Sequence, residues 1–146
     1  MPNEYSYRNL ILWQKAQELT LEIVKLIVSM PKTSVNDIIS RQVVRSASSI
    51  AANVAEGHGR YAPRGHAYHL SIAKGSACET DSWLDLLRRS GAITAEQEGP
   101  LQATCQELIA MLTSKIRDLE KLSVHKVREE RAEYDPAGRG TPAPEQ

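Results

Sequence analysis

Four polar side chains stand on stretches that otherwise read as apolar helix, and their types suit hydrogen bonding or proton transfer. They are Asn53 and Glu56 in one stretch and Ser76 and Glu79 in another. If both helices face a core, we expect Asn53, Ser76 and Glu79 to lie near each other inside it. A buried carboxylate must be paired or hydrogen-bonded, because burial alone costs several kcal/mol or raises its pKa.

This polar cluster has two interpretations. It is either an acid with a shifted pKa in a functional site, or a polar contact that fixes helix register, with Gly75 allowing close approach. We expect no second acid or activated nucleophile beside Asn53, Ser76 and Glu79 inside the bundle. We therefore interpret the cluster as structural, predict no catalytic residue, and expect a protein that is not an enzyme.

Three histidines suggest a metal site. His66 and His69 are three residues apart and share a helix face, and His58 precedes them. A metal centre in a helical bundle usually takes Glu-x-x-His pairs from two helices, and this sequence contains none. We predict no metal and no cofactor, and the role of the three histidines stays open.

Two further motifs fall short of an active site. The sequence Gly57–Arg60 resembles part of a phosphate loop but lacks the Gly-Lys-Ser/Thr ending, and we expect Arg60 to pair with Glu56. Cys78 and Cys105 lie in the middle of predicted helices, where a nucleophile is poorly exposed. We interpret both cysteines as small core residues of a protein in a reducing compartment.

Charge is distributed unevenly along a chain whose formal net charge is zero. Residues 41–74 have one acidic side chain, whereas residues 75–112 are net acidic. A basic surface on the first block would bind nucleic acid, or would meet the acidic block of a neighbouring subunit. The candidate contact residues are Arg41, Arg45, Arg60, Arg64 and Lys74.

Apolar residues recur every three to four positions along four segments, which predicts an all-α fold. Short links between them favour an up-down-up-down antiparallel four-helix bundle. In the second segment the expected core positions are Ile39, Val43, Ala47, Ile50 and Val54. The predicted helices are residues 8–29, 35–57, 66–90 and 100–122, with a charged stretch at 126–134 that can extend the last one.

Local signals place the helix ends. Ser34 or Asn36 can cap the second helix, and Gly57 is expected to stop it in a left-handed conformation. Thr94 and Gln97 form a capping box for the fourth helix, although Pro100 favours a start at the proline itself.

The 146 residues are expected to form one domain at residues 8–122, after an N-terminal arm at 1–7. Residues 123–146 are expected to hold a charged helix extension and a disordered tail rich in proline and glycine. No apolar run reaches 18 residues, and the first residues lack the layout of a signal peptide. We expect a cytoplasmic protein without membrane contact.

The first and third predicted helices have apolar arcs that are too wide for a single core. A monomer would expose more contiguous apolar surface than such proteins usually tolerate. The sequence therefore predicts a homo-oligomer.

Four sequence stretches together resemble the 23S rRNA intervening-sequence protein family of bacterial four-helix bundle proteins. They are Tyr7–Ala16, Gln42–Ala47, Ser49–Arg60 and Ile72–Glu79, and the resemblance covers about residues 5–122. The chain departs from the family pattern at His58, His66 and His69, where aromatics are usual, and at Ala51, where proline is frequent.

The resemblance implies a ring-shaped homopentamer. It also implies a distant similarity to the accessory proteins of diversity-generating retroelements, which contact RNA and a reverse transcriptase. We therefore expect a non-enzymatic oligomeric scaffold that binds RNA or a protein partner through a repeated basic surface. The alternative is a small-ligand or metal-binding bundle built on the Asn/Ser/Glu cluster.

Overall fold

The computed structural model describes residues 4–134. Within this range it has four α-helices and no strand, which confirms the all-α prediction. A short 3-10 turn, η1, precedes them. The elements are η1 (Tyr7–Asn9), α1 (Ile11–Ser29), α2 (Ser34–His58), α3 (Pro63–Arg89) and α4 (Ala95–Tyr134).

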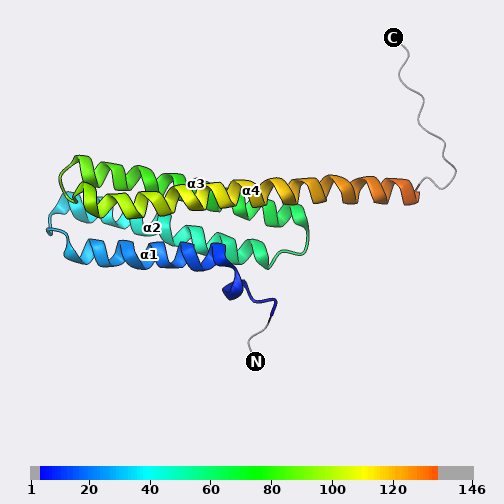
Figure 1. The fold of residues 1–146 in the computed structure, drawn as a ribbon, viewed down its shortest axis with the longest axis horizontal. Helices are drawn as coiled ribbons and strands as arrows, with labels where there is room; N and C mark the ends of the chain where they lie inside the picture. Colours follow the sequence, from blue (N-terminus) through cyan, green and yellow to red (C-terminus); the bar gives the residue numbers. More distant parts are fainter. Residues whose placement is uncertain (1–3, 135–146) are drawn as a thin grey trace, which may run out of the picture.

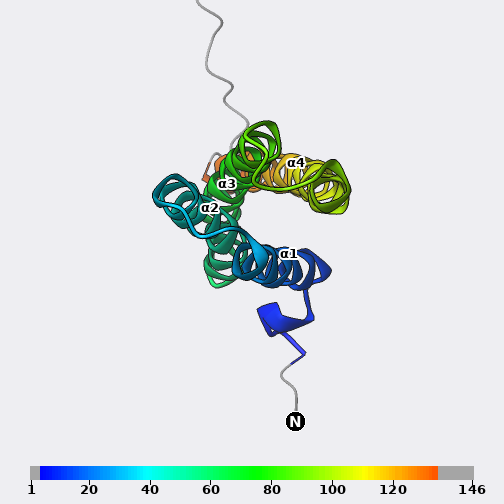
Figure 2. The same ribbon diagram turned by 90° about the vertical axis from the view of Figure 1, so that its left-hand side faces the viewer.

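The four helices lie side by side along one long axis (Figure 1). Viewed along that axis they follow an arc, with α2 and α3 in its middle and α1 and α4 at its two ends (Figure 2). The two end helices, α1 and α4, contact each other less extensively than α2 contacts α3 or α3 contacts α4. An ion pair of 2.8 Å between Lys15 and Glu107 joins them.

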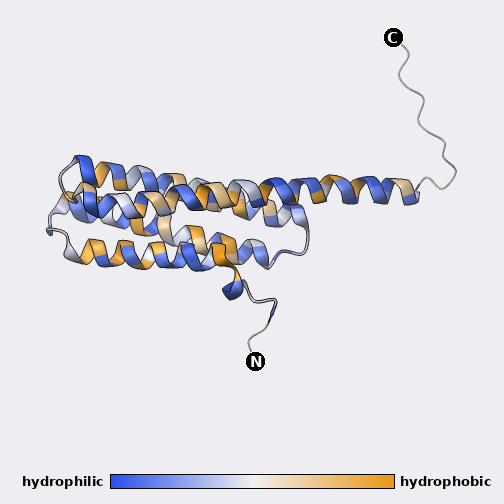
Figure 3. Cartoon of the chain, viewed as in Figure 1, coloured by the Kyte–Doolittle hydropathy of each residue, from blue (hydrophilic) through white to orange (hydrophobic). Residues whose placement is uncertain are grey.

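The core lies along the inner side of this arc. The five core positions expected on α2 are all buried, which confirms the predicted stripe. On α3 the core residues are Leu70, Ala73, Ala77 and Leu84, whereas Tyr68 and Ile72 are exposed. Figure 3 shows apolar residues recurring along every helix. The largest fully buried side chains include Leu19, Ile23, Ile50, Leu84, Leu108 and Leu112.

The first helix begins later than residue 8. The Ser6 hydroxyl accepts a hydrogen bond of 3.2 Å from the Arg8 amide and starts η1. Leu10 then takes an extended conformation, with φ −73° and ψ 122°, so α1 begins at Ile11. The apolar pattern runs through this break, and periodicity alone therefore did not reveal it.

The starts of α2 and α4 also differ from the predicted ones. Thr33, rather than Ser34 or Asn36, caps α2, because its hydroxyl accepts from the Asn36 amide at 3.1 Å. Thr94 and Gln97 form the predicted capping box, with bonds of 2.9 and 3.1 Å. Pro100 consequently lies inside α4 instead of starting it.

Helix α4 runs without interruption to Tyr134, so the charged stretch at 126–134 is helical and projects beyond the other helices (Figure 1). The predicted disordered tail at 135–146 lies outside the described residues, as do residues 1–3. None of the described helices combines the length and apolarity needed to cross a bilayer.

Apolar side chains remain exposed on the two helices whose arcs were too wide. On α1, Leu21 is 50% exposed and Val28 is 75% exposed. On α3, Tyr68 is 62% exposed and Leu86 is 42% exposed. A single chain does not cover these faces.

Candidate functional site

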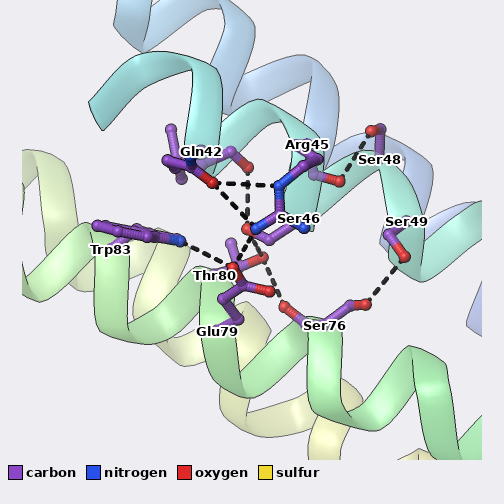
Figure 4. Close-up of polar contacts among 10 residues, drawn as sticks. Gln42, Arg45, Ser46, Ser48, Ser49, Ser76, Glu79, Thr80 and Trp83 are labelled. Atoms are coloured by element: carbon purple, nitrogen blue, oxygen red, sulfur yellow. Dashed lines mark hydrogen bonds and ion pairs between the residues drawn. The ribbon is translucent and has the colours of Figure 1, made fainter. Parts of the chain in front are cut away.

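A seam of polar side chains joins α2 to α3. The Thr80 hydroxyl lies 2.8 Å from the Ser46 hydroxyl, and both side chains are completely buried (Figure 4). Further along the same interface, Ser76 donates to the Ser49 hydroxyl at 2.9 Å. Asn53 donates to that hydroxyl at 3.0 Å. Each of these contacts satisfies a polar group at a helix interface, so the seam fixes how α2 and α3 pack.

Ser49 connects Asn53 to Ser76, and helical spacing in the sequence places it with Ser46 and Asn53 on one polar strip of α2. Thr80, the most deeply buried member on α3, was not predicted. The available signal was spacing, because Thr80 lies one helical turn after Ser76 and therefore faces the same neighbour.

Glu79 does not lie inside the bundle, and that expectation was wrong. Its side chain is 38% exposed and forms an ion pair with Arg45. The Trp83 indole also donates to it at 3.2 Å (Figure 4). Glu79 lies at the rim of the α2–α3 interface because Arg45 reaches across from α2 to meet it.

Glu56 also lies outside the seam, and His69 links it to Asn53. It accepts a hydrogen bond from Arg60 at 2.6 Å, which confirms the predicted pair. The His69 ring nitrogen Nε2 lies 3.7 Å from the same carboxylate. Of the four predicted cluster residues, part-buried Asn53 and buried Ser76 are thus joined by Ser49. The other two, Glu56 and Glu79, are more exposed and form ion pairs.

The histidines pack around the end of α2. Gly57 lies against α3 so closely that a Cβ atom there would come within 3.1 Å of both His66 Cδ2 and His69 Cβ. Close approach therefore explains this glycine, and the predicted left-handed helix stop was wrong, since α2 continues through His58. Among the described glycines, Gly91 alone has a positive φ, of 81°.

Each histidine has a different environment. His69 Nδ1 lies 3.3 Å from the Asn53 side-chain oxygen. His58 Nε2 lies 2.6 Å from the Tyr5 carbonyl oxygen and ties the N-terminal arm to α2. Burial lowers the pKa of His66, and the nearby Lys115 lowers it further. Within the described residues no group of three or more His, Cys, Asp or Glu side chains is arranged to hold a metal ion.

The two cysteines are not equivalent. Cys105 is buried in the core as predicted, but Cys78 is exposed, which corrects the expectation for that residue. Burial raises the pKa of the Cys105 thiol to about 12, and Asp81 contributes to the shift. A thiol that stays protonated at neutral pH is a poor nucleophile.

The five predicted basic contact residues fall into two groups. Arg45 and Arg60 are held by Glu79 and Glu56, as described above. The structure of residues 4–134 shows no hydrogen bond or ion pair for the other three, which are Arg41, Arg64 and Lys74.

Arg64 lines a groove of about 650 Å³ between the start of α3 and the projecting part of α4. Arg128 and Arg131 line it from α4, and Tyr68 and Val127 lie among its apolar walls. Neither Arg128 nor Arg131 has a partner among the described residues. We call these lining residues the α3–α4 groove: Arg64, Ala67, Tyr68, Ser71, Ile116, Glu120, Ser123, Val124, Val127, Arg128 and Arg131.

Comparison with known proteins identifies the family of this chain. The model of the 23S rRNA-intervening sequence proteins matches residues 8–114. The chain belongs to this family. Arg64 lies inside the match, whereas Arg128 and Arg131 lie beyond it, on the later part of α4.

A solved structure from the S23 ribosomal protein family of Bacteroides thetaiotaomicron, a protein of unknown function, is similar to this chain. The two sequences are 32% identical, and the TM-score is 0.67. The match covers 73% of this chain and 98% of that one. No curated protein matches the chain.

Proposed function

We propose that this family member is a non-enzymatic, oligomeric scaffold that binds single-stranded RNA in the α3–α4 groove. The carrying observation is that three arginines without partners converge on one groove beside an exposed tyrosine: Arg64, Arg128 and Arg131, with Tyr68.

This combination suits a single-stranded nucleic acid. Guanidinium groups recognise phosphates, and the face of an exposed aromatic ring accepts a stacked base. One carboxylate, that of Glu120, opposes the three guanidinium groups, so the lining is net positive. Outside the groove lining, the Lys126 ammonium group lies 5.7 Å from the centre of the exposed Tyr61 ring, which is a second aromatic surface beside a positive charge.

Two of the five basic residues predicted from the sequence already form ion pairs within the chain. Arg45 and Arg60 neutralise carboxylates of their own chain and are expected to contribute less to phosphate binding. Arg41 and Lys74 have no such partner, and they lie on α2 and α3 outside the groove lining.

The oligomer in this proposal is a ring with up-down-up-down subunits. Short links at residues 30–33, 59–62 and 90–94 support that order, because a short link joins antiparallel neighbours. The exposed apolar side chains Leu21 and Val28 on α1 and Leu86 on α3, which lie outside the groove, support association, since subunit contacts commonly bury such side chains. The family resemblance makes a pentamer the expected size, and a ring would repeat the groove once per subunit.

The two free cysteines support a place in a reducing compartment, and we propose the cytoplasm.

Fluorescence anisotropy with a labelled single-stranded RNA of mixed sequence tests the RNA site. The variant Arg64→Ala/Arg128→Ala/Arg131→Ala should bind at least about ten-fold more weakly than the wild type, because three phosphate contacts are lost. Arg89→Ala removes an exposed arginine from the far end of α3 and should leave binding unchanged. Equal binding by wild type and triple variant would reject the groove as the RNA site. No RNA binding by the wild type would direct the search to a protein partner.

A further inference from the structure

A second cavity of about 610 Å³ lies where parts of all four helices meet. The beginnings of α1 and α3, the end of α2 and the middle of α4 surround it. Apolar side chains make up most of its lining, among them Leu12, Val54 and Met111. Its volume falls within the range of roughly 300–1,000 Å³ that is typical of pockets for small molecules.

All the ionisable groups on this lining are nitrogen bases. They are His58, His66 and Lys115, and no carboxylate lines the cavity. His58 is already engaged through its Nε2 by the Tyr5 carbonyl. His66 and Lys115 have no hydrogen bond or ion pair within the described chain.

These groups stand close enough to affect one another. The rings of His58 and His66 meet edge to face, with their centres 6.4 Å apart. Burial is the main cause of the lowered pKa of His66, and the positive charges of Lys115 and His58 add to it. From α1 the lining is apolar, with Ile11 and Leu12, so no acid compensates from that side. A negative charge bound here would complement all three groups.

We infer that this cavity binds a small amphipathic anion, a carboxylate on a medium-length aliphatic chain. The carboxylate pairs with Lys115 and His66, and the chain lies on the apolar lining. A purely apolar ligand would leave the Lys115 ammonium group without a partner, whereas a highly charged ligand such as a nucleotide would have no polar contacts over most of the lining. The site is independent of the proposed RNA function, because it shares no residue with the α3–α4 groove.

Isothermal titration calorimetry of the full chain with octanoate tests the inference, with octan-1-ol as the uncharged ligand of equal chain length. We expect octanoate to saturate one site per chain and to bind at least about ten-fold more tightly than octanol, as a charge-assisted contact allows. No saturable octanoate binding, or equal binding of the alcohol, would overturn the assignment.

The matched variants are Lys115→Ala and Lys121→Ala, which remove exposed lysines from the same helix inside and outside the cavity. Lys115→Ala should weaken octanoate binding about ten-fold and leave octanol binding unchanged, whereas Lys121→Ala should change neither. Unchanged octanoate affinity in Lys115→Ala would contradict the proposed pairing. Because Lys115 is exposed, its removal should not unfold the protein.

The pH dependence of octanoate binding tests the contribution of His66. The anion favours the protonated imidazole, so octanoate should bind more tightly as the pH falls from about 7.5 to about 6, where the ligand is still mainly ionised. His66→Phe preserves a ring against Gly57 but cannot be protonated, and it should reduce this pH response relative to the wild type. A pH response of equal size in both proteins would exclude His66 from the site.

Discussion

The hydroxyl of Thr80 lies 2.8 Å from the hydroxyl of Ser46, and neither side chain is exposed to solvent. This contact joins α2 to α3 at the centre of their interface. Replacing Thr80 with valine preserves shape and removes the hydroxyl, while Ser46 keeps its bond to the Val43 carbonyl. We therefore expect the free energy of unfolding to fall by about 0.5–1.5 kcal/mol. Urea denaturation, followed by circular dichroism, measures this loss.

A double-mutant cycle separates the contact from packing effects. Each hydroxyl also bonds a backbone carbonyl, Ser46 to Val43 and Thr80 to Ser76. Ser46→Ala and Thr80→Val together should cost less than the sum of the two single changes, because each single change already removes the same bond between the hydroxyls. Simple additivity would show that the two groups do not stabilise each other.

Replacement of glycine by alanine should have opposite effects on stability at Gly57 and Gly75. Gly57→Ala should destabilise by about 1–3 kcal/mol, because its Cβ would crowd both histidines of α3. Gly75 was expected to allow close helix approach, but a Cβ there would meet nothing within 4 Å. Gly75→Ala should therefore stabilise the helix by about 0.5–1 kcal/mol. Thermal unfolding of the two variants compares them directly, and equal shifts would refute this account of Gly57.

Glu79→Ala should have a small effect, below about 1 kcal/mol, because its ion pair with Arg45 is partly exposed. Chemical denaturation of the variant in low and high salt measures it. A loss of several kcal/mol that did not depend on salt would mean that Glu79 is buried.

The two cysteines should react differently. In the folded protein, Ellman's reagent should modify Cys78 and not Cys105, which should react only after unfolding. The folded-state pKa of Cys105 is raised, so its neutral thiol supports folding fully below pH 9 and loses that contribution as the pH rises towards 12. Stability that fell less steeply in Cys105→Ala over this alkaline range would agree, whereas identical pH profiles would argue against a buried thiol.

Several features set by residues close together in sequence were predicted correctly, although the cap of α2 at Thr33 was not. The capping box of Thr94 and Gln97 forms as expected because both partners lie within one turn. The core stripe of α2, from Ile39 to Val54, follows directly from helical periodicity. The ion pair of Arg60 with Glu56, four residues apart, was predicted for the same reason.

Features that depend on contacts between helices were not predictable in this way. Glu79 was placed inside because its helix face seemed apolar, but Arg45 approaches from α2 and holds it at the rim. Glu98 is buried beneath Arg88 of the preceding helix, and no local pattern marks that pair. The groove arginines of α4 were overlooked because only the length of α4 brings Arg128 and Arg131 beside α3.

The salt dependence of RNA binding tests the central claim most directly. The wild type and the variant Arg64→Ala/Arg128→Ala/Arg131→Ala would be titrated with the same single-stranded RNA at several salt concentrations. Each phosphate contact contributes about 0.7 to the slope of log affinity against log salt, so loss of three contacts should reduce that slope by about 2. Wild-type binding that does not vary with salt, or equal slopes in the two proteins, would contradict the account.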